Sequence, residues 1–185
     1  GRRNPAPRLT ARPKAGVSMP PAGQRNLALD ARDAVLRVPP HAGAGPLPLL
    51  VLLHGASSSG EIQLGRVSAA CDAAGLAVLA PSSRGGTWDA IRGDFEEDPA
   101  FINRALTKTF ELVPVDPARI VLAGFSDGAT YALSLGMING DYFSKLVAFS
   151  GSFTSTDSFG RMNENSPENC CTNGLRLKSS SISIA

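Results

Sequence analysis

Ser126 lies in the pentapeptide Gly-Phe-Ser-Asp-Gly, between the apolar run "RIVLA" and the helix-like stretch "ATYALSLGMI". A strand, a sharp turn and a helix, in that order, are the setting in which the serine of a Gly-x-Ser-x-Gly motif becomes a nucleophile. Gly124 and Gly128 are expected because side chains at these positions would collide with the neighbouring strand and helix. The pattern predicts a reactive serine at the carboxyl end of a strand, in line with the positive end of the next helix.

A second element of the same chemistry is the sequence "LLHGASSSG", which closes an earlier apolar run. Proteins with such a serine place backbone N–H groups at this point, where they stabilise the negative charge that develops on a carbonyl oxygen. The N–H groups of Ala56 and Asp127 are the predicted donors. His54 and Gly55 then support the backbone of this loop, and His54 is not expected to act as the general base.

Three other interpretations stay open at the level of sequence. The pentapeptide could be a tight turn in which Ser126 merely caps a helix. The loop "HGASSSG" could be a phosphate cradle, although it lacks the Gly-Lys-Ser/Thr ending of a P-loop. A cluster of acidic residues could hold a metal ion, but no histidine or further carboxylate accompanies it at defined spacing, which favours a solvated acidic loop. These acidic residues are Asp94, Glu96, Glu97 and Asp98.

The charge of the chain is unevenly distributed. The net charge of the 185 residues is +2, yet residues 1–29 contain six basic residues and no acid, which leaves 12 Lys and Arg against 16 Asp and Glu from residue 30 onward. A nucleic-acid-binding domain would carry its basic residues on the folded part, so that class of protein is not expected. The chain contains no run of about 18 apolar residues, which predicts no membrane span. No resident cofactor or metal ion is predicted.

The three cysteines do not suggest a redox or metal site. Cys71 lies in the Ala-rich stretch "VSAACDAAG", where a small buried thiol is the usual explanation. Cys170 and Cys171 are adjacent and lack the spacing of a zinc or thioredoxin motif. Nothing in this pattern requires an oxidising compartment, so a soluble intracellular protein is favoured, and the basic start leaves organelle targeting open.

Strands and helices alternate along the middle of the chain. Strands are predicted at residues 33–40, 47–53, 76–81, 119–124 and 144–153, and helices at residues 61–75, 100–112 and 126–138. This alternation is typical of βαβ units and predicts an α/β fold, a three-layer, doubly wound and mostly parallel sheet over residues 32–153. Residues 1–31 are predicted to form an extended, flexible leader. The polar residues 154–185 predict a disordered tail.

Four segments occur in a recognisable order: "LLVLLHGASSSG", "LAVLAPSSRGGTWD", "VDPARIVLAGFSDGATYALSLG" and "LVAFSGSF". Together they resemble the α/β-hydrolase superfamily, and more narrowly its phospholipase/carboxylesterase branch, which includes acyl-protein thioesterase-like and dienelactone hydrolase-like esterases. The resemblance covers roughly residues 30–153, and "RLTARP" near the start also fits.

The resemblance implies a site and a substrate class. Ser126 corresponds to the nucleophile, the N–H groups of Ala56 and Asp127 to the oxyanion hole, and Trp88 with Asp89 to a loop that borders the site. A lone tryptophan is as often simply packed against the sheet. The implied substrate is a small ester or thioester, and no cofactor is needed.

The sequence departs from this family after Ser126. In the α/β hydrolases the catalytic residues run in the order serine, acid, histidine, so both partners should follow the serine. His41 and His54 are the two histidines of the chain, and both precede it. Asp157 is the one alternative for the acid. The resemblance therefore predicts a domain without its last strands and helices, whose apolar sheet edge a partner or a dimer would cover.

Two functional hypotheses follow. The first is a serine carboxylic-ester or thioester hydrolase by family, which acts through an acyl-enzyme on Ser126, with this chain weak or inactive because it lacks the histidine. The second is a non-catalytic hydrolase-like binding protein or a truncated isoform. The intact serine motif favours the first hypothesis, since a binding module has little use for a strained serine turn.

Overall fold

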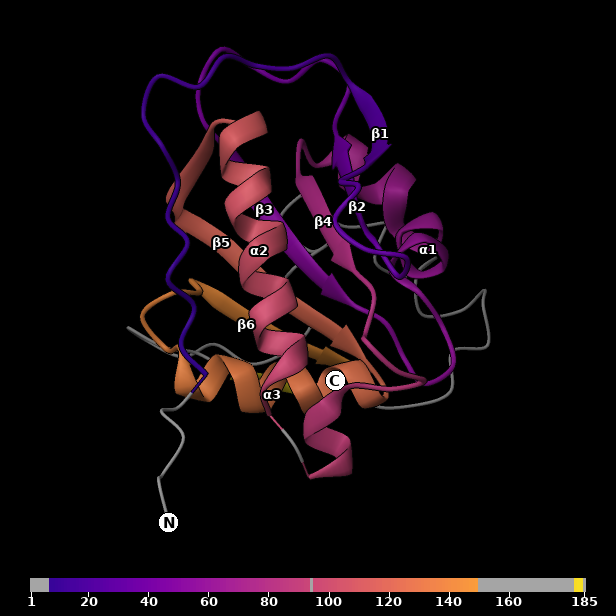
Figure 1. Ribbon diagram of the computed structural model, residues 1–185. Helices are drawn as coiled ribbons and strands as arrows, with labels where there is room; N and C mark the ends of the chain where they lie inside the picture. The colour runs from indigo at the N-terminus through magenta and orange to yellow at the C-terminus, as the bar shows by residue number, and fades with distance from the viewer. Residues whose placement is uncertain (1–6, 94, 150–181, 185) are drawn as a thin grey trace.

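The computed structural model describes residues 7–93, 95–149 and 182–184, and in it a seven-stranded sheet is covered by helices on both faces (Figure 1). The strands are β1 Gly23–Asn26, β2 Ala34–Val38, β3 Leu47–Leu53, β4 Ala77–Pro81, β5 Val115–Phe125, β6 Lys145–Phe149 and β7 Ile182–Ile184. The helices are α1 Gly60–Ala73, α2 Glu97–Leu112 and α3 Asp127–Ile138, with a 3₁₀ turn, η1, at Asp89–Arg92.

The strand order is β1-β2-β4-β3-β5-β6-β7. β1 and β2 are antiparallel to their neighbours, and β4, β3, β5, β6 and β7 run parallel to one another. The parallel strands therefore end at the same edge of the sheet, where the loops that follow β3, β4 and β5 meet. The predicted mostly parallel α/β sheet is confirmed.

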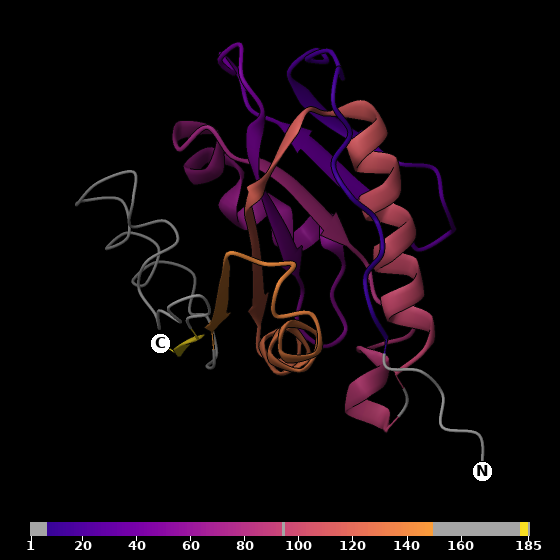
Figure 2. The same cartoon turned by 90° about the vertical axis from the view of Figure 1, so that its left-hand side faces the viewer.

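The central strands are apolar on both faces because each face is covered by helices. On one face, Leu50 and Leu52 of β3 share a core with Leu64 of α1. On the other face, Val51 of β3 shares a core with Ile102 of α2 and with residues of α3. Figures 1 and 2 show α2 and α3 on this second side of the sheet. The three-layer arrangement follows from strands that bury both of their faces.

The structure describes residues 7–31 of the predicted extended, flexible leader, and these residues lie against the folded domain. Two asparagines hold its backbone: Asn139 Oδ1 accepts from Leu9 N at 2.8 Å, and Asn103 Oδ1 accepts from Thr10 N at 2.8 Å. Leu9 is buried, and β1 extends the sheet by pairing with β2. The segment runs beside α2 (Figures 1 and 2). Its order comes from side chains about a hundred residues away, so the local sequence carries no periodicity to reveal it.

The sheet also extends beyond its predicted last strand. Ile182–Ile184 pairs in parallel with β6, with Leu146 opposite Ile182 and Ala148 opposite Ile184 (Figure 2). These three residues belong to the predicted disordered tail, and the edge of β6 presents backbone groups that a β-branched segment can pair with. Residues 154–181 and residue 185 of the predicted tail lie outside the described residues.

Among the residues that the structure describes, no helix combines the length and apolar character that a membrane crossing requires.

Replacing Asn139 by Ala should release the amino-terminal segment. The buried Asn139 also donates from Nδ2 to Pro7 O at 3.1 Å, so the truncation leaves a donor and an acceptor of the segment unpaired. We expect a loss of about 2 kcal/mol in the free energy of unfolding, measured by urea denaturation, and faster tryptic cleavage after Arg8 and Lys14. Asp141→Ala, an exposed position two residues away, is the control. Equal tryptic cleavage in both variants would contradict the prediction.

Candidate active site

Ser126 lies between the end of β5 and the first residue of α3, in a backbone conformation that is rare for a residue with a side chain. Its φ is 54° and its ψ is −117°. The side chain makes no capping hydrogen bond to α3, although its position is that of a helix cap. Ser126 is exposed, and its N–H donates to Phe149 O at 2.9 Å. The alternative in which Ser126 merely caps the helix therefore has no support in the geometry, and the turn has the strain that the motif predicts.

The glycines of the motif are required by close contacts between backbones. A Cβ added to Gly124 would lie 2.0 Å from Gly128 O, and one added to Gly128 would lie 2.5 Å from the carbonyl oxygens of Leu53 and His54. Such distances are far inside van der Waals contact, so no rotamer change of a neighbour can relieve them. The steric reason expected from the sequence is confirmed.

The loop after β3 lies directly beside the serine turn. Leu53 pairs with Gly124 in the sheet, so the residues that follow both strands emerge side by side. A Cβ on Gly55 would be 3.6 Å from Ser126 Cβ. Ala56 follows Gly55 and is exposed, like Ser126. We call residues 54–60 the oxyanion loop, because its predicted N–H donor at Ala56 would face the same space as the serine.

His54 is a buried structural side chain with both ring nitrogens engaged. Its side chain has 0% exposure. Nδ1 lies 2.6 Å from Gly55 O and Nε2 accepts from Ser83 N at 2.9 Å, so both contacts require the neutral ring with the proton on Nδ1. Burial lowers the pKa of His54, the bond to Gly55 raises it, and the nearby Arg32 charge lowers it. A ring held in this way supports the loop and has no free nitrogen to accept a proton from Ser126.

The loop after β4 holds the oxyanion loop from the other side. We call residues 82–89 the clasp loop. Gly86 O accepts from Ser57 N at 2.7 Å, and Trp88 Nε1 donates to His54 O at 2.8 Å. Thr87 Oγ1 donates to Asp127 Oδ2 at 2.7 Å, which ties the same loop to the first residue of α3. The clasp loop therefore contacts both predicted oxyanion segments.

Trp88 and Asp89, predicted to border the site, are both buried. The indole of Trp88 stacks on Tyr131 of α3 with ring centroids 4.9 Å apart and lies 4.8 Å from the His54 ring. Trp88 is therefore packed in the core, the alternative that the sequence left open for a lone tryptophan. Its indole N–H supports the oxyanion loop through the carbonyl of His54.

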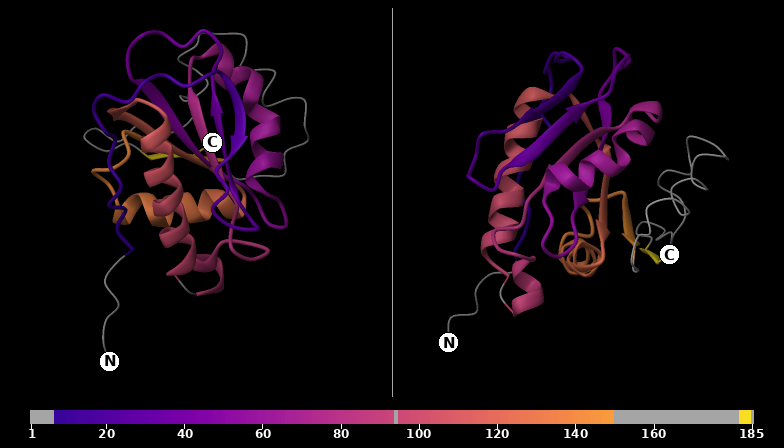
Figure 3. Two further views of the ribbon diagram at one scale, coloured as in Figure 1. Left: turned by 45° about the horizontal axis from the view of Figure 1, so that its top comes forward. Right: turned by 90° about the vertical axis from the view of Figure 1, so that its right-hand side faces the viewer.

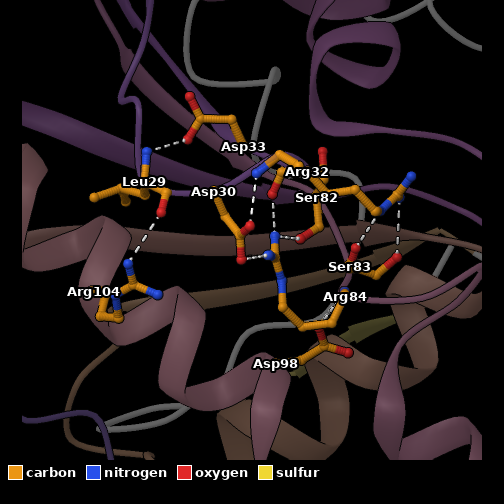
Figure 4. A network of polar contacts seen from close by, with 10 residues as sticks. Leu29, Asp30, Arg32, Asp33, Ser82, Ser83, Arg84, Asp98 and Arg104 are labelled. Carbon is orange, nitrogen blue, oxygen red and sulfur yellow. Dashed lines mark hydrogen bonds and ion pairs between the residues drawn. The ribbon is translucent and has the colours of Figure 1, made fainter.

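Two arginines join the clasp loop to the segment before β2 (Figure 4). Arg32 donates from Nε to Ser83 O at 2.5 Å and from Nη2 to Ser58 O at 3.0 Å, so one guanidinium bridges the clasp loop and the oxyanion loop. Arg84 donates from Nη1 to Asp30 Oδ2 at 2.7 Å and packs over Phe101. These contacts were missed from the sequence, because arginines in a coil-like segment carry no pattern that distinguishes them from solvated charges.

The predicted solvated acidic loop is wrong at Asp98. Its side chain has 0% exposure and accepts from two backbone N–H groups, that of Arg84 at 2.7 Å and that of Asp89 at 2.6 Å. Burial raises the pKa of Asp98, while the two backbone bonds lower it. Glu96 and Glu97 are exposed, and Asp94 lies outside the described residues. Among the described residues, no group of acids, histidines and cysteines could hold a metal ion.

The structure places Gly55 against Ser126, and the predicted donors at Ala56 and Asp127 are each the next residue in the chain after this contact. In the described residues, neither histidine is placed to act as a base for Ser126. His41 lies in the loop between β2 and β3. Because β2 is antiparallel to β4, this loop lies at the amino ends of the parallel strands, whereas Ser126 follows the carboxyl end of β5. Figure 3 shows this loop and α3 at opposite ends of the sheet. His54 is engaged as described. Asp157, the alternative acid, lies outside the described residues.

Comparison with known proteins supports the fold. No family model matches the chain. It is 28% identical over 144 residues to a putative esterase, NocK, of Nocardia uniformis subsp. tsuyamanensis, an alignment that covers 71% of this chain and 42% of the relative. The chain therefore spans less than half the length of this curated relative.

Solved structures of serine hydrolases and esterases share the architecture. The serine hydrolase FphF of Staphylococcus aureus matches with a TM-score of 0.54 and 18% identity over 77% of this chain and 60% of its own. The acetyl xylan esterase of Aspergillus awamori matches with a TM-score of 0.57 and 17% identity over 71% and 53%. The S-formylglutathione hydrolase FrmB of S. aureus matches with a TM-score of 0.55 and 18% identity over 81% and 66%. The chain has the α/β-hydrolase fold, as its sequence predicted.

Gly128→Ala should be strongly destabilising. The added methyl would meet two backbone carbonyls at 2.5 Å, and moving them would distort β3. We expect a loss of at least about 3 kcal/mol in the free energy of unfolding, or failure to fold. The matched control is Gly65→Ala, an exposed position of α1 where a Cβ meets nothing within 4 Å. That change should stabilise the protein by up to about 1 kcal/mol. Urea denaturation that ranks the two variants in the reverse order would contradict this account.

The free energy of unfolding should decrease as the pH falls below 6.5. The folded state lowers the pKa of His54 from 6.5, so between the two values the unfolded chain binds the extra proton and stability is lost as the pH falls. This one group can contribute a slope of up to about 1.4 kcal/mol per pH unit.

Urea denaturation of His41→Gln at several pH values, together with the ¹⁵N spectrum of its single remaining imidazole, tests the role of His54. We expect the His54 ring of the folded protein to be neutral and protonated on Nδ1 at pH 6.5 and above. A folded-state ring that is protonated on both nitrogens near pH 6.5, or that carries its proton on Nε2, would be the contrary result.

Proposed function

We propose that this chain carries the nucleophile and the oxyanion hole of a serine hydrolase that acts on carboxylic esters or thioesters. The observation that supports it most is the conformation of Ser126: a non-glycine residue at φ 54°, exposed, with a hydroxyl that does not cap its helix. Strain of this kind persists only where the surroundings impose it, and here it presents a hydroxyl at the edge of the sheet.

The mechanism divides the reaction between two groups of residues. Ser126 Oγ attacks the carbonyl carbon, and the carbonyl oxygen gains negative charge between the N–H groups of Ala56 and Asp127. Asp127 is the first residue of α3, so its N–H is one that a helix leaves without an internal partner. Collapse of the tetrahedral intermediate expels the alcohol or thiol and leaves an acyl-enzyme, which water then hydrolyses.

Neither histidine of the chain is placed to act as the general base, so a histidine base would have to be supplied from outside these 185 residues. His54 precedes Ser126 and has both nitrogens engaged, and the chain contains no histidine after Ser126. Loss of a triad member in a serine hydrolase costs on the order of 10⁴ to 10⁶ in turnover, and the oxyanion hole retains part of the remainder. The proposed activity of the chain by itself is therefore weak.

The missing histidine also supports a second candidate, a hydrolase-like protein that binds a small acyl compound or a protein partner without turning it over. The two candidates differ in whether Ser126 reacts once a base is supplied.

Labelling with a fluorophosphonate probe, in buffer and with added imidazole, separates the two candidates. The enzyme hypothesis predicts slow labelling of Ser126 in buffer and labelling at least about tenfold faster with imidazole, which replaces the general base. Ser126→Ala should not label at all. Ser134→Ala, on the same helix, should label like the parent chain. A folded chain whose Ser126 stays unlabelled at saturating imidazole would favour the binding protein and overturn the proposed function.

A further inference from the structure

We propose that Asp98 is a positioning residue, which holds the clasp loop in the shape that presents the oxyanion donor at Ala56. This inference rests on the proposed function for its catalytic meaning and on the hydrogen bonds of the described residues for its structural content. Asp98 lies in the first turn of α2, on a different element from both oxyanion segments, and its hydrogen bonds reach them through the clasp loop.

The carboxylate of Asp98 closes the clasp loop. Asp98 Oδ1 accepts from Arg84 N at 2.7 Å and Oδ2 accepts from Asp89 N at 2.6 Å, so the two oxygens hold residues five positions apart in the same loop. Asp89 returns the contact, since its Oδ2 accepts from Asp98 N at 3.0 Å and from Glu96 N at 2.9 Å. The loop is thus fastened to the start of α2 at both ends. A buried carboxylate is well suited to this, because it offers acceptors only.

The closed clasp loop presents two groups that bind the oxyanion loop. Between the two fastened points lie Gly86 and Trp88, whose carbonyl and indole N–H bind the oxyanion loop. The bond from Ser57 N to Gly86 O matters most, because Ser57 has φ 56°. A serine in this left-handed region is disfavoured and needs a partner to keep it there. The Ser57 N–H belongs to the peptide unit that directly follows Ala56, so holding it restrains the backbone dihedrals of Ala56, the residue of the predicted donor.

The closed clasp loop also contacts the first residue of α3. Thr87, also between the fastened points, donates to the carboxylate of Asp127. One closed loop therefore sets the relative position of the two segments that carry the proposed oxyanion donors. Opening it at Asp98 should loosen both segments while leaving the sheet intact.

The test compares Asp98→Asn with Glu97→Gln. The asparagine keeps one acceptor oxygen and turns an N–H₂ toward the second backbone donor, so one fastening is lost. Glu97 is its exposed neighbour in the same helical turn and serves as the matched control. Trp88 is the only tryptophan of the chain and reports on the clasp loop directly. We expect Asp98→Asn to shift the Trp88 emission to longer wavelength, to increase its quenching by acrylamide and to leave the far-ultraviolet dichroism unchanged.

Amide hydrogen exchange separates positioning from general destabilisation. In Asp98→Asn the amides of Ser57 and Ser83 should exchange at least about tenfold faster, while those of Val147 in β6 should not change. Imidazole-assisted labelling of Ser126 should slow by at least about tenfold, and Glu97→Gln should match the parent chain in all readouts. A folded Asp98→Asn with parental Trp88 quenching and parental Ser57 exchange would overturn the positioning role.

The outcome stays decisive if the proposed function fails or the variant does not fold. Trp88 fluorescence and amide hydrogen exchange need no reaction at Ser126. An unreactive serine would therefore refute the proposed function, and these two measurements would still decide the positioning role of Asp98. If the Asp98→Asn variant does not fold, amide hydrogen exchange measured in the parent chain tests the proposal instead. The amides of Arg84, Asp89, Ser57 and Ser83 should then open together with one protection factor. If the amides of Ser57 and Ser83 opened independently of those of Arg84 and Asp89, the proposal would be overturned.

Discussion

The structure depends on how closely the end of β3 approaches the turn between β5 and α3. At this point the backbones of Gly128, Leu53 and His54 are in contact, and no atom of a side chain fits between them. In the same place Gly55 packs against Ser126, where an added Cβ would lie 3.6 Å from Ser126 Cβ, and Ser126 has a backbone conformation that is rare for a residue with a side chain. The proposed oxyanion donors at Ala56 and Asp127 depend on this approach, because it sets the two loops side by side.

The apolar core brings the strands together, and polar contacts set the loops at their ends. β3, β4 and β5 are parallel and buried on both faces, so their carboxyl ends meet without any help from the loops. The loops are then held by a small number of buried polar groups. His54 contributes a neutral imidazole and Asp98 a carboxylate, and each is bound through backbone N–H or C=O groups. Buried groups of this kind specify one loop conformation, because leaving any of them unpaired costs free energy.

Much of this could be predicted from the sequence, and the parts that could not share a cause. The strands, the glycines around Ser126 and the supporting role expected of His54 follow from patterns of a few consecutive residues. The ordered segment around Leu9, the buried carboxylate of Asp98 and the bridging guanidinium of Arg32 depend on partners far away in the chain. A polar residue looks the same in the sequence whether its partner is water or a distant backbone amide. The pairing of Ile182–Ile184 with β6 is of the same kind, since a strand edge accepts a short segment whatever precedes it.

A crystal structure of the chain after phosphonylation at Ser126 would test the account most directly. The phosphoryl oxygen of such an adduct takes the place of the oxyanion. We predict that this oxygen lies about 2.7–3.1 Å from both the Ala56 and the Asp127 backbone nitrogens, with the clasp loop unchanged. An adduct whose oxygen points to solvent, with either N–H turned elsewhere, would show that these residues do not form an oxyanion hole.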